Sequence, residues 1–76
     1  MTLEEMDAGQ KGIIVKVEGG RGIAHRLASM GIRPGKAITK VSAMLMRGPV
    51  TVKIDNSQIA LGRGVAKKIH VELEGK

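Results

Sequence analysis

Five short segments of the sequence carry the hydrophobic pattern of β-strands. The clearest is residues 50–54, where three branched apolar residues alternate with Thr51 and Lys53. The other segments are rich in β-branched residues or alternate in part, which is typical of half-buried strands. Besides residues 50–54, the predicted strands are residues 12–18, 37–44, 58–61 and 68–73.

One segment, residues 22–30, follows a helical period instead. Ile23, Leu27 and Met30 recur at i, i+4 and i+7, so they form one apolar stripe along a short helix. Gly31 follows directly, and a glycine at this position can adopt the left-handed conformation that satisfies the last carbonyls of a helix. The sequence therefore predicts a short helix that ends at Gly31.

Glycine and proline divide the chain into segments too short for a helical bundle. Thr2 and Glu5 have the spacing of a capping box, which predicts one helical turn at residues 3–6. Residues 55–57 tolerate turn geometry and are expected to join the strands on either side as a hairpin. We predict a mainly β fold: a small SH3-like barrel of about five strands with a short inserted helix, in a single domain spanning residues 1–76.

The composition sets limits on the core and on the surroundings of the protein. With 42% hydrophobic residues, no aromatic residue and no cysteine, the core must be built from aliphatic side chains and methionine, without a disulfide. The absence of cysteine agrees with a reducing, cytoplasmic location. No apolar run approaches the roughly 20 residues of a membrane-spanning helix. The formal net charge of +6 favours acidic partners but does not choose among them.

The sequence offers no recognisable set of catalytic residues, so we predict that the protein is not an enzyme. Residues 31–37 are similar to a phosphate-binding loop, but three residues separate the glycines instead of four and Ala37 replaces the required Ser or Thr. The three serines and two histidines show no spacing typical of a nucleophilic triad. Specific nucleic-acid recognition is also not expected, because binders of single strands stack bases on aromatic side chains.

The two histidines, His25 and His70, are the candidate ligands for a divalent transition metal such as iron or zinc. They lie far apart in the sequence, and without cysteine they are too few for a closed tetrahedral zinc site. An iron site with two histidines and one carboxylate would require His25, His70 and Glu72 to converge. The alternative is that both histidines face solvent.

The candidate docking surface is a run of three large apolar residues, Met44, Leu45 and Met46, followed by Arg47. Because a strand has two faces, at least one of the three is expected to point outward. An exposed apolar tip beside a basic side chain suits contact with another protein. The alternative is that the segment folds over one end of the barrel.

The segment from Arg26 to Gly35 resembles the FeoA family, ferrous iron transport protein A, in its Arg-Leu, Gly-Ile and Pro-Gly pairs. The similarity extends over almost the whole chain. It implies an SH3-like barrel and a cytosolic, non-enzymatic accessory role in ferrous iron uptake. It also implies a partnership with the FeoB transporter and its GTP-binding domain, so that any membrane contact is indirect. Arg26 and Arg47 are the expected contacts.

Two further points follow from this resemblance. The same domain type ends repressors of the DtxR kind, which leaves open a metal-responsive module that binds iron or zinc through His25 or His70. The chain departs from the family at residues 62–64, where Gly-Arg-Gly replaces a charged helical turn. The conformation of this last turn is therefore an open question at the level of sequence.

Overall fold

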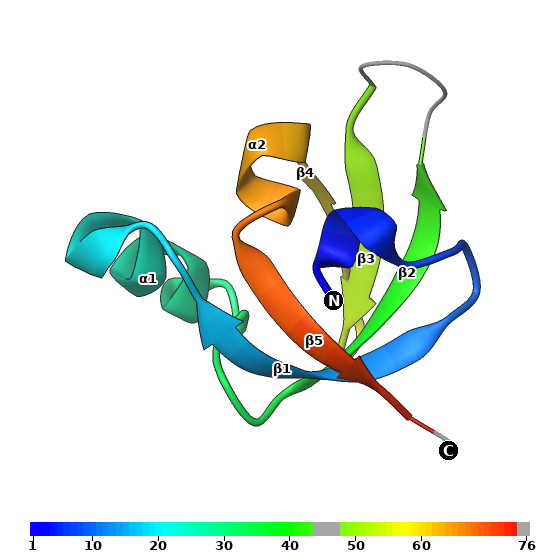
Figure 1. Ribbon diagram of the computed structural model, residues 1–76, viewed down its shortest axis with the longest axis horizontal. Helices are drawn as coiled ribbons and strands as arrows, with labels where there is room; N and C mark the ends of the chain where they lie inside the picture. The colour runs from blue at the N-terminus through cyan, green and yellow to red at the C-terminus, as the bar shows by residue number, and fades with distance from the viewer. Residues whose placement is uncertain (44–47, 75–76) are drawn as a thin grey trace.

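The computed structural model describes residues 1–43 and 48–74, which form one five-stranded antiparallel sheet (Figure 1). The strand order is β4-β3-β2-β1-β5, and the sheet curls around a common interior. Helix α1 (Gly20–Ser29) joins β1 to β2, and the short helix α2 (Arg63–Ala66) joins β4 to β5. The strands are β1 (Lys11–Val17), β2 (Ala37–Ala43), β3 (Val50–Ile54), β4 (Ser57–Leu61) and β5 (Ile69–Leu73).

These elements confirm the predicted mainly β barrel with a short helix after the first strand. The strand boundaries lie within one residue of those predicted, apart from the end of β2, since Met44 lies outside the described residues. Strands β4 and β5 are the two edges of the sheet, and α2 lies at the side between them. No helix of the described residues is long and apolar enough to cross a membrane.

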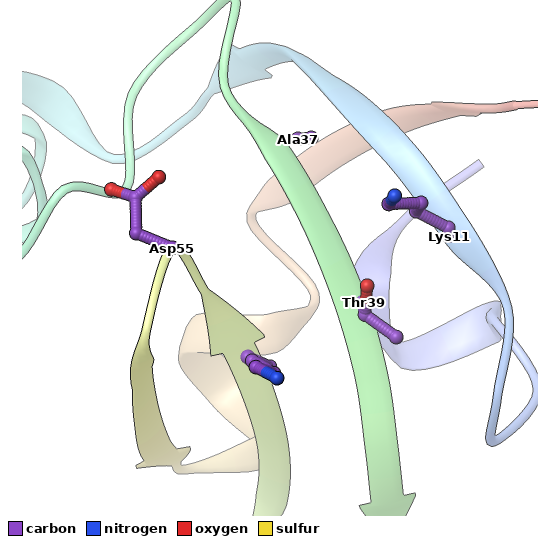
Figure 2. Close-up of a pocket in the computed structure, with 5 residues that line it drawn as sticks. Lys11, Ala37, Thr39 and Asp55 are labelled. Atoms are coloured by element: carbon purple, nitrogen blue, oxygen red, sulfur yellow. The ribbon is translucent and has the colours of Figure 1, made fainter.

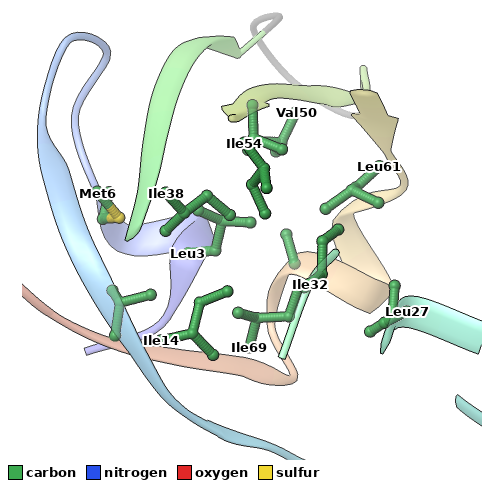
Figure 3. Packing of buried hydrophobic residues seen from close by; sticks show 13 residues of the cluster. Leu3, Met6, Ile14, Leu27, Ile32, Ile38, Val50, Ile54, Leu61 and Ile69 are labelled. Carbon is green, nitrogen blue, oxygen red and sulfur yellow. The ribbon is translucent and has the colours of Figure 1, made fainter. Parts of the chain in front are cut away.

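The core is aliphatic, as the composition requires. In β3 the alternating valines and isoleucine point inward while Lys53 is exposed, which follows from the period of two. Figure 3 shows side chains from the inner face of the curled sheet, from α1 and from the N-terminal turn meeting in one cluster. The buried hydrophobic residues are Leu3, Met6, Ile14, Leu27, Ile32, Ile38, Val50, Val52, Ile54, Leu61, Ala66, Ile69 and Val71.

Helix α1 ends in a Schellman motif, as Gly31 led us to expect. Gly31 has a φ of +89°, its N–H donates to the carbonyl of Ala28 at 2.9 Å, and the N–H of Ile32 donates to that of Leu27 at 2.9 Å. Ile32 and Leu27 are both buried, so the motif also ties the helix to the core. Met30 differs from the prediction because it is the cap residue, where the chain turns, and 38% of it is exposed.

An N-terminal 3₁₀ turn, η1 (Leu3–Glu5), lies across one end of the barrel (Figure 1). The N–H of Thr2 donates to Glu5 Oε1 at 2.7 Å, which confirms the predicted turn. Leu3 is buried in the core, and the carbonyl of Met1 accepts the N–H of Val71 at 2.8 Å. The first residues of the chain therefore cover the barrel end and extend the edge of β5.

Helix α2 occupies the position where the sequence left the conformation open. Residues 62–64 enter a four-residue helix despite their two glycines. The helix is held from within, because Ala66 is fully buried, and from outside, because Arg63 Nη1 lies 3.7 Å from Glu4 Oε2. Tertiary packing thus overrides a weak local helix propensity here.

Candidate functional site

Lys40 is the buried charged residue of the described structure, with 3% of its surface exposed. It lies on β2, on the same side as Ile38, and points into the end of the barrel that η1 covers. Its ammonium donates to the carbonyl of Glu4 at 2.8 Å and to that of Met6. Burial lowers the pKa of Lys40 below its ordinary value, and the nearby Arg63 guanidinium lowers it further. These contacts give Lys40 the role of anchoring η1.

The two histidines occupy different elements. His25 is exposed on α1, whereas His70 is half-buried on β5, and its Nε2 lies 3.2 Å from Glu18 Oε2. These two atoms are within ion-pair distance but not in hydrogen-bond geometry. Over residues 1–43 and 48–74, no group of three or more His, Asp or Glu side chains could hold a metal ion. The described residues therefore do not assemble His25, His70 and Glu72 into an iron site.

The predicted docking residues can be placed in part. Arg26 is exposed on α1 beside His25, and its carbonyl accepts the hydroxyl of Ser29 at 2.7 Å. Arg21, also exposed, lies near the start of the same helix, so α1 presents basic side chains outward. The predicted apolar tip, which comprises Met44, Leu45, Met46 and Arg47, lies outside the described residues.

A hollow of about 320 Å³ lies on the outer face of the sheet (Figure 2). Its lining comes from three neighbouring strands and the turn after β3: Lys11, Ala37, Thr39, Lys53 and Asp55. Lys11 pairs with Thr39 across β1 and β2, and Thr39 pairs with Lys53 across β2 and β3. These three side chains form one cross-strand row, which we call the Lys–Thr–Lys row. Sequence reasoning missed this row because it depends on the register of three strands.

The fold and its surfaces define the class of the protein. A small antiparallel barrel with a helix after its first strand, covered at one end by an N-terminal turn, is an SH3-like β-barrel domain. The chain belongs to the FeoA family, because its sequence matches the FeoA domain over residues 1–73. FeoA proteins are accessories of ferrous iron transport, as the resemblance at Arg26 to Gly35 implied.

Similar sequences carry related names. A "Putative Fe(2+) transport protein A" of Campylobacter jejuni is 36% identical over 73 residues, which covers 96% of this chain and 99% of that protein. An "Fe(2+) transport protein A/Fe(2+) transporter FeoB fusion protein" of Porphyromonas gingivalis is 40% identical over 73 residues. In that case the match covers 96% of this chain but 9% of the fusion protein.

Solved structures show the same fold. A crystal structure of an iron uptake regulatory protein, FeoA, superposes with a TM-score of 0.87 at 34% identity and covers 96% of this chain and 95% of that one. FeoA of Stenotrophomonas maltophilia, described as a prokaryotic SH3 domain protein complexed with zinc, superposes with a TM-score of 0.81 at 25% identity. That match covers 95% of this chain and 89% of that one.

Proposed function

We propose that this protein is a non-enzymatic accessory of ferrous iron uptake that docks on a FeoB-type transporter and contacts its GTP-binding domain in the cytoplasm. The observation that carries the proposal is the Porphyromonas gingivalis protein, in which a segment similar to this chain shares one polypeptide with FeoB. Linking two modules makes their association intramolecular and raises its effective concentration to the millimolar range. Where FeoA and FeoB are separate polypeptides, FeoA needs a docking surface to associate with FeoB.

The outward face of α1 is the described surface that fits this role. Arg21 and Arg26 are exposed there, and the whole chain carries a formal net charge of +6. A basic face of this kind accelerates encounter with an acidic surface and fixes the orientation of docking. Arg26 is the proposed electrostatic contact. Met44, Leu45, Met46 and Arg47 remain the proposed apolar contact.

The proposal is tested with isotope-labelled chain titrated with FeoB of the same organism, once as its cytosolic domain and once as the full-length transporter in nanodiscs. Amide shifts are expected on α1 around Arg26. Arg26→Glu is expected to weaken binding at least tenfold, because it places a like charge against the acidic partner. Lys67→Glu, an equal charge change at an exposed position after α2, is the matched control. Absence of binding to both forms of FeoB refutes direct docking.

A metal-responsive role through His25 or His70 is the second candidate. It is favoured by the zinc complex of the Stenotrophomonas maltophilia protein. The described residues bring together two donors, His70 and Glu18, which is fewer than the three protein ligands of an open zinc site. A complete site would need a ligand from elsewhere.

Calorimetric titration with Zn²⁺ tests this candidate. Binding through His70 is expected to disappear in His70→Ala and to persist in His25→Ala. Loss of binding in His25→Ala with binding kept in His70→Ala would instead identify His25, on α1, as the ligand. Equal binding by both variants and the parent chain would exclude histidine ligation.

A further inference from the structure

We propose that the hollow over the Lys–Thr–Lys row binds a phosphate-bearing ligand, with Lys11, Thr39 and Lys53 as the donors. This site lies on the outer face of the sheet and is independent of the proposed contacts on α1. Its donors come from three consecutive strands of the sheet, and the ligand would lie over β2, the middle strand of the three (Figure 2).

The register places the two lysines symmetrically about Thr39. Neighbouring strands are about 4.8 Å apart, so Lys11 and Lys53 start about 10 Å from each other, on opposite sides of β2. The flexible four-carbon stem of lysine can bring both ammonium groups over the middle strand. The floor between them is low because β2 contributes the small residues Ala37 and Thr39. The row therefore forms a trough with a cation on each wall.

The charge of this trough is not neutralised by the acids around it. In the part of the chain that the structure describes, neither Lys11 nor Lys53 lies in an ion pair. Asp55 lines the hollow, but its carboxylate is held by Lys36, whose Nζ lies 3.0 Å from Oδ2. Glu74 neighbours Lys11 through a backbone hydrogen bond of 2.9 Å, without a side-chain ion pair. Among the described residues, the ammonium groups of Lys11 and Lys53 are therefore not held by these carboxylates.

The arrangement of donors favours phosphate over carboxylate. A terminal phosphate offers three oxygens, which match two ammonium groups and the Thr39 hydroxyl, each from a separate strand. Lysine binds phosphate as a point charge, so it needs no planar fork geometry. A carboxylate carries a single charge and holds its two oxygens in one plane, so it matches three donors on separate strands less well than the three-oxygen face of a phosphate. The hollow, at about 320 Å³, has room for a phosphate with a small group attached.

The test is a titration of isotope-labelled protein with inorganic phosphate at low, constant ionic strength, with acetate as the comparison anion. Saturable shifts are expected at Lys11, Thr39 and Lys53, with phosphate binding more tightly than acetate. The double variant Lys11→Ala/Lys53→Ala is expected to lose at least tenfold in affinity. Arg21→Ala/Lys67→Ala removes the same charge from exposed positions elsewhere and is expected to stay within twofold of the parent protein.

Thr39→Val is a second variant, which removes the hydroxyl but keeps both charges, and a severalfold loss of phosphate affinity is expected. Thermal unfolding of each variant establishes that it is folded. The proposal is overturned by shifts that do not saturate, by equal losses in the two double variants, or by equal binding of acetate. A nucleoside diphosphate and vesicles containing phosphatidic acid then distinguish a soluble ligand from a lipid headgroup, according to which binds more tightly than inorganic phosphate.

Discussion

Replacing Lys40 with methionine removes the ammonium that anchors η1 while keeping an unbranched apolar stem. The carbonyls of Glu4 and Met6 then lose their donor, the first in a partly buried position and the second in a buried one. Leaving a buried polar group without a partner costs about 1–3 kcal/mol. Against this loss, the desolvation of the ammonium is relieved. Water can still reach the partly buried carbonyl of Glu4, so the main cost is the unpaired carbonyl of Met6. We therefore expect a net loss of stability of about 1–3 kcal/mol.

This loss is large for a protein of this size. A chain of 76 residues has an unfolding free energy of about 4–11 kcal/mol, and each kcal/mol shifts the Tm by about 4–8 °C. Urea and thermal unfolding followed by circular dichroism measure the change directly. Lys53→Met is the matched control, because Lys53 is exposed and its replacement is expected to change stability by less than about 0.5 kcal/mol. A Lys40→Met variant as stable as the parent protein would refute the anchoring role.

The pH dependence of the stability difference between the parent protein and Lys40→Met gives an independent check. Burial lowers the pKa of Lys40 in the folded state below the ordinary value of 10.5. At any pH between the folded-state pKa and 10.5, the unfolded chain therefore binds more protons than the folded protein. The stability of the parent protein relative to Lys40→Met should therefore rise with pH across that window. It should be constant below the folded pKa, where both states are protonated. A relative stability that falls with pH would contradict the assigned environment of Lys40.

Two further predictions concern the backbone and the N-terminal turn. Gly12→Ala places a Cβ 2.7 Å from the carbonyl oxygen of Glu72 and should destabilise the fold by about 1–3 kcal/mol. Gly64→Ala, in α2 with open space around it, should be neutral or stabilising by about 0.4–1 kcal/mol in the same urea assay. The N–H of Thr2 lowers the pKa of Glu5, so the parent protein should lose stability relative to Glu5→Gln as pH falls from 4.5 through the folded value. Acid titration of both proteins, monitored by circular dichroism, would show an unchanging difference if this hydrogen bond had no effect.

The sequence predicted those parts of the fold that depend on local periodicity. The strand at residues 50–54 and the helix end at Gly31 follow from alternation and from the φ that glycine tolerates, and both are confirmed. Helix α2 could not be predicted in this way, because its glycines disfavour a helix and the burial of Ala66 supplies the stabilisation. The core that buries Ala66 is built from segments far apart in the sequence, such as Leu3 and Ile38.

The functional surfaces were harder to predict for the same reason. Lys40 follows Ile38 by two residues and so shares its side of β2, but this spacing does not show that carbonyls of the N-terminal turn accept its ammonium. The contact between His70 and Glu18 and the alignment of Lys11 with Lys53 both require a strand register that no local pattern encodes. Side chains that only strand pairing brings together cannot be identified from the sequence before the register of the sheet is known.

The backbone hydrogen bond between Met1 and Val71 has a practical consequence for protein engineering. The Met1 amine also lies 3.4 Å from the Val71 carbonyl, so any affinity tag or fusion partner attached ahead of Met1 modifies a group that already contacts β5. Proteolytic trimming of the first six residues would remove Leu3 and Met6 from the core and both acceptors of Lys40. Tags for biophysical work on this protein therefore belong after Glu74.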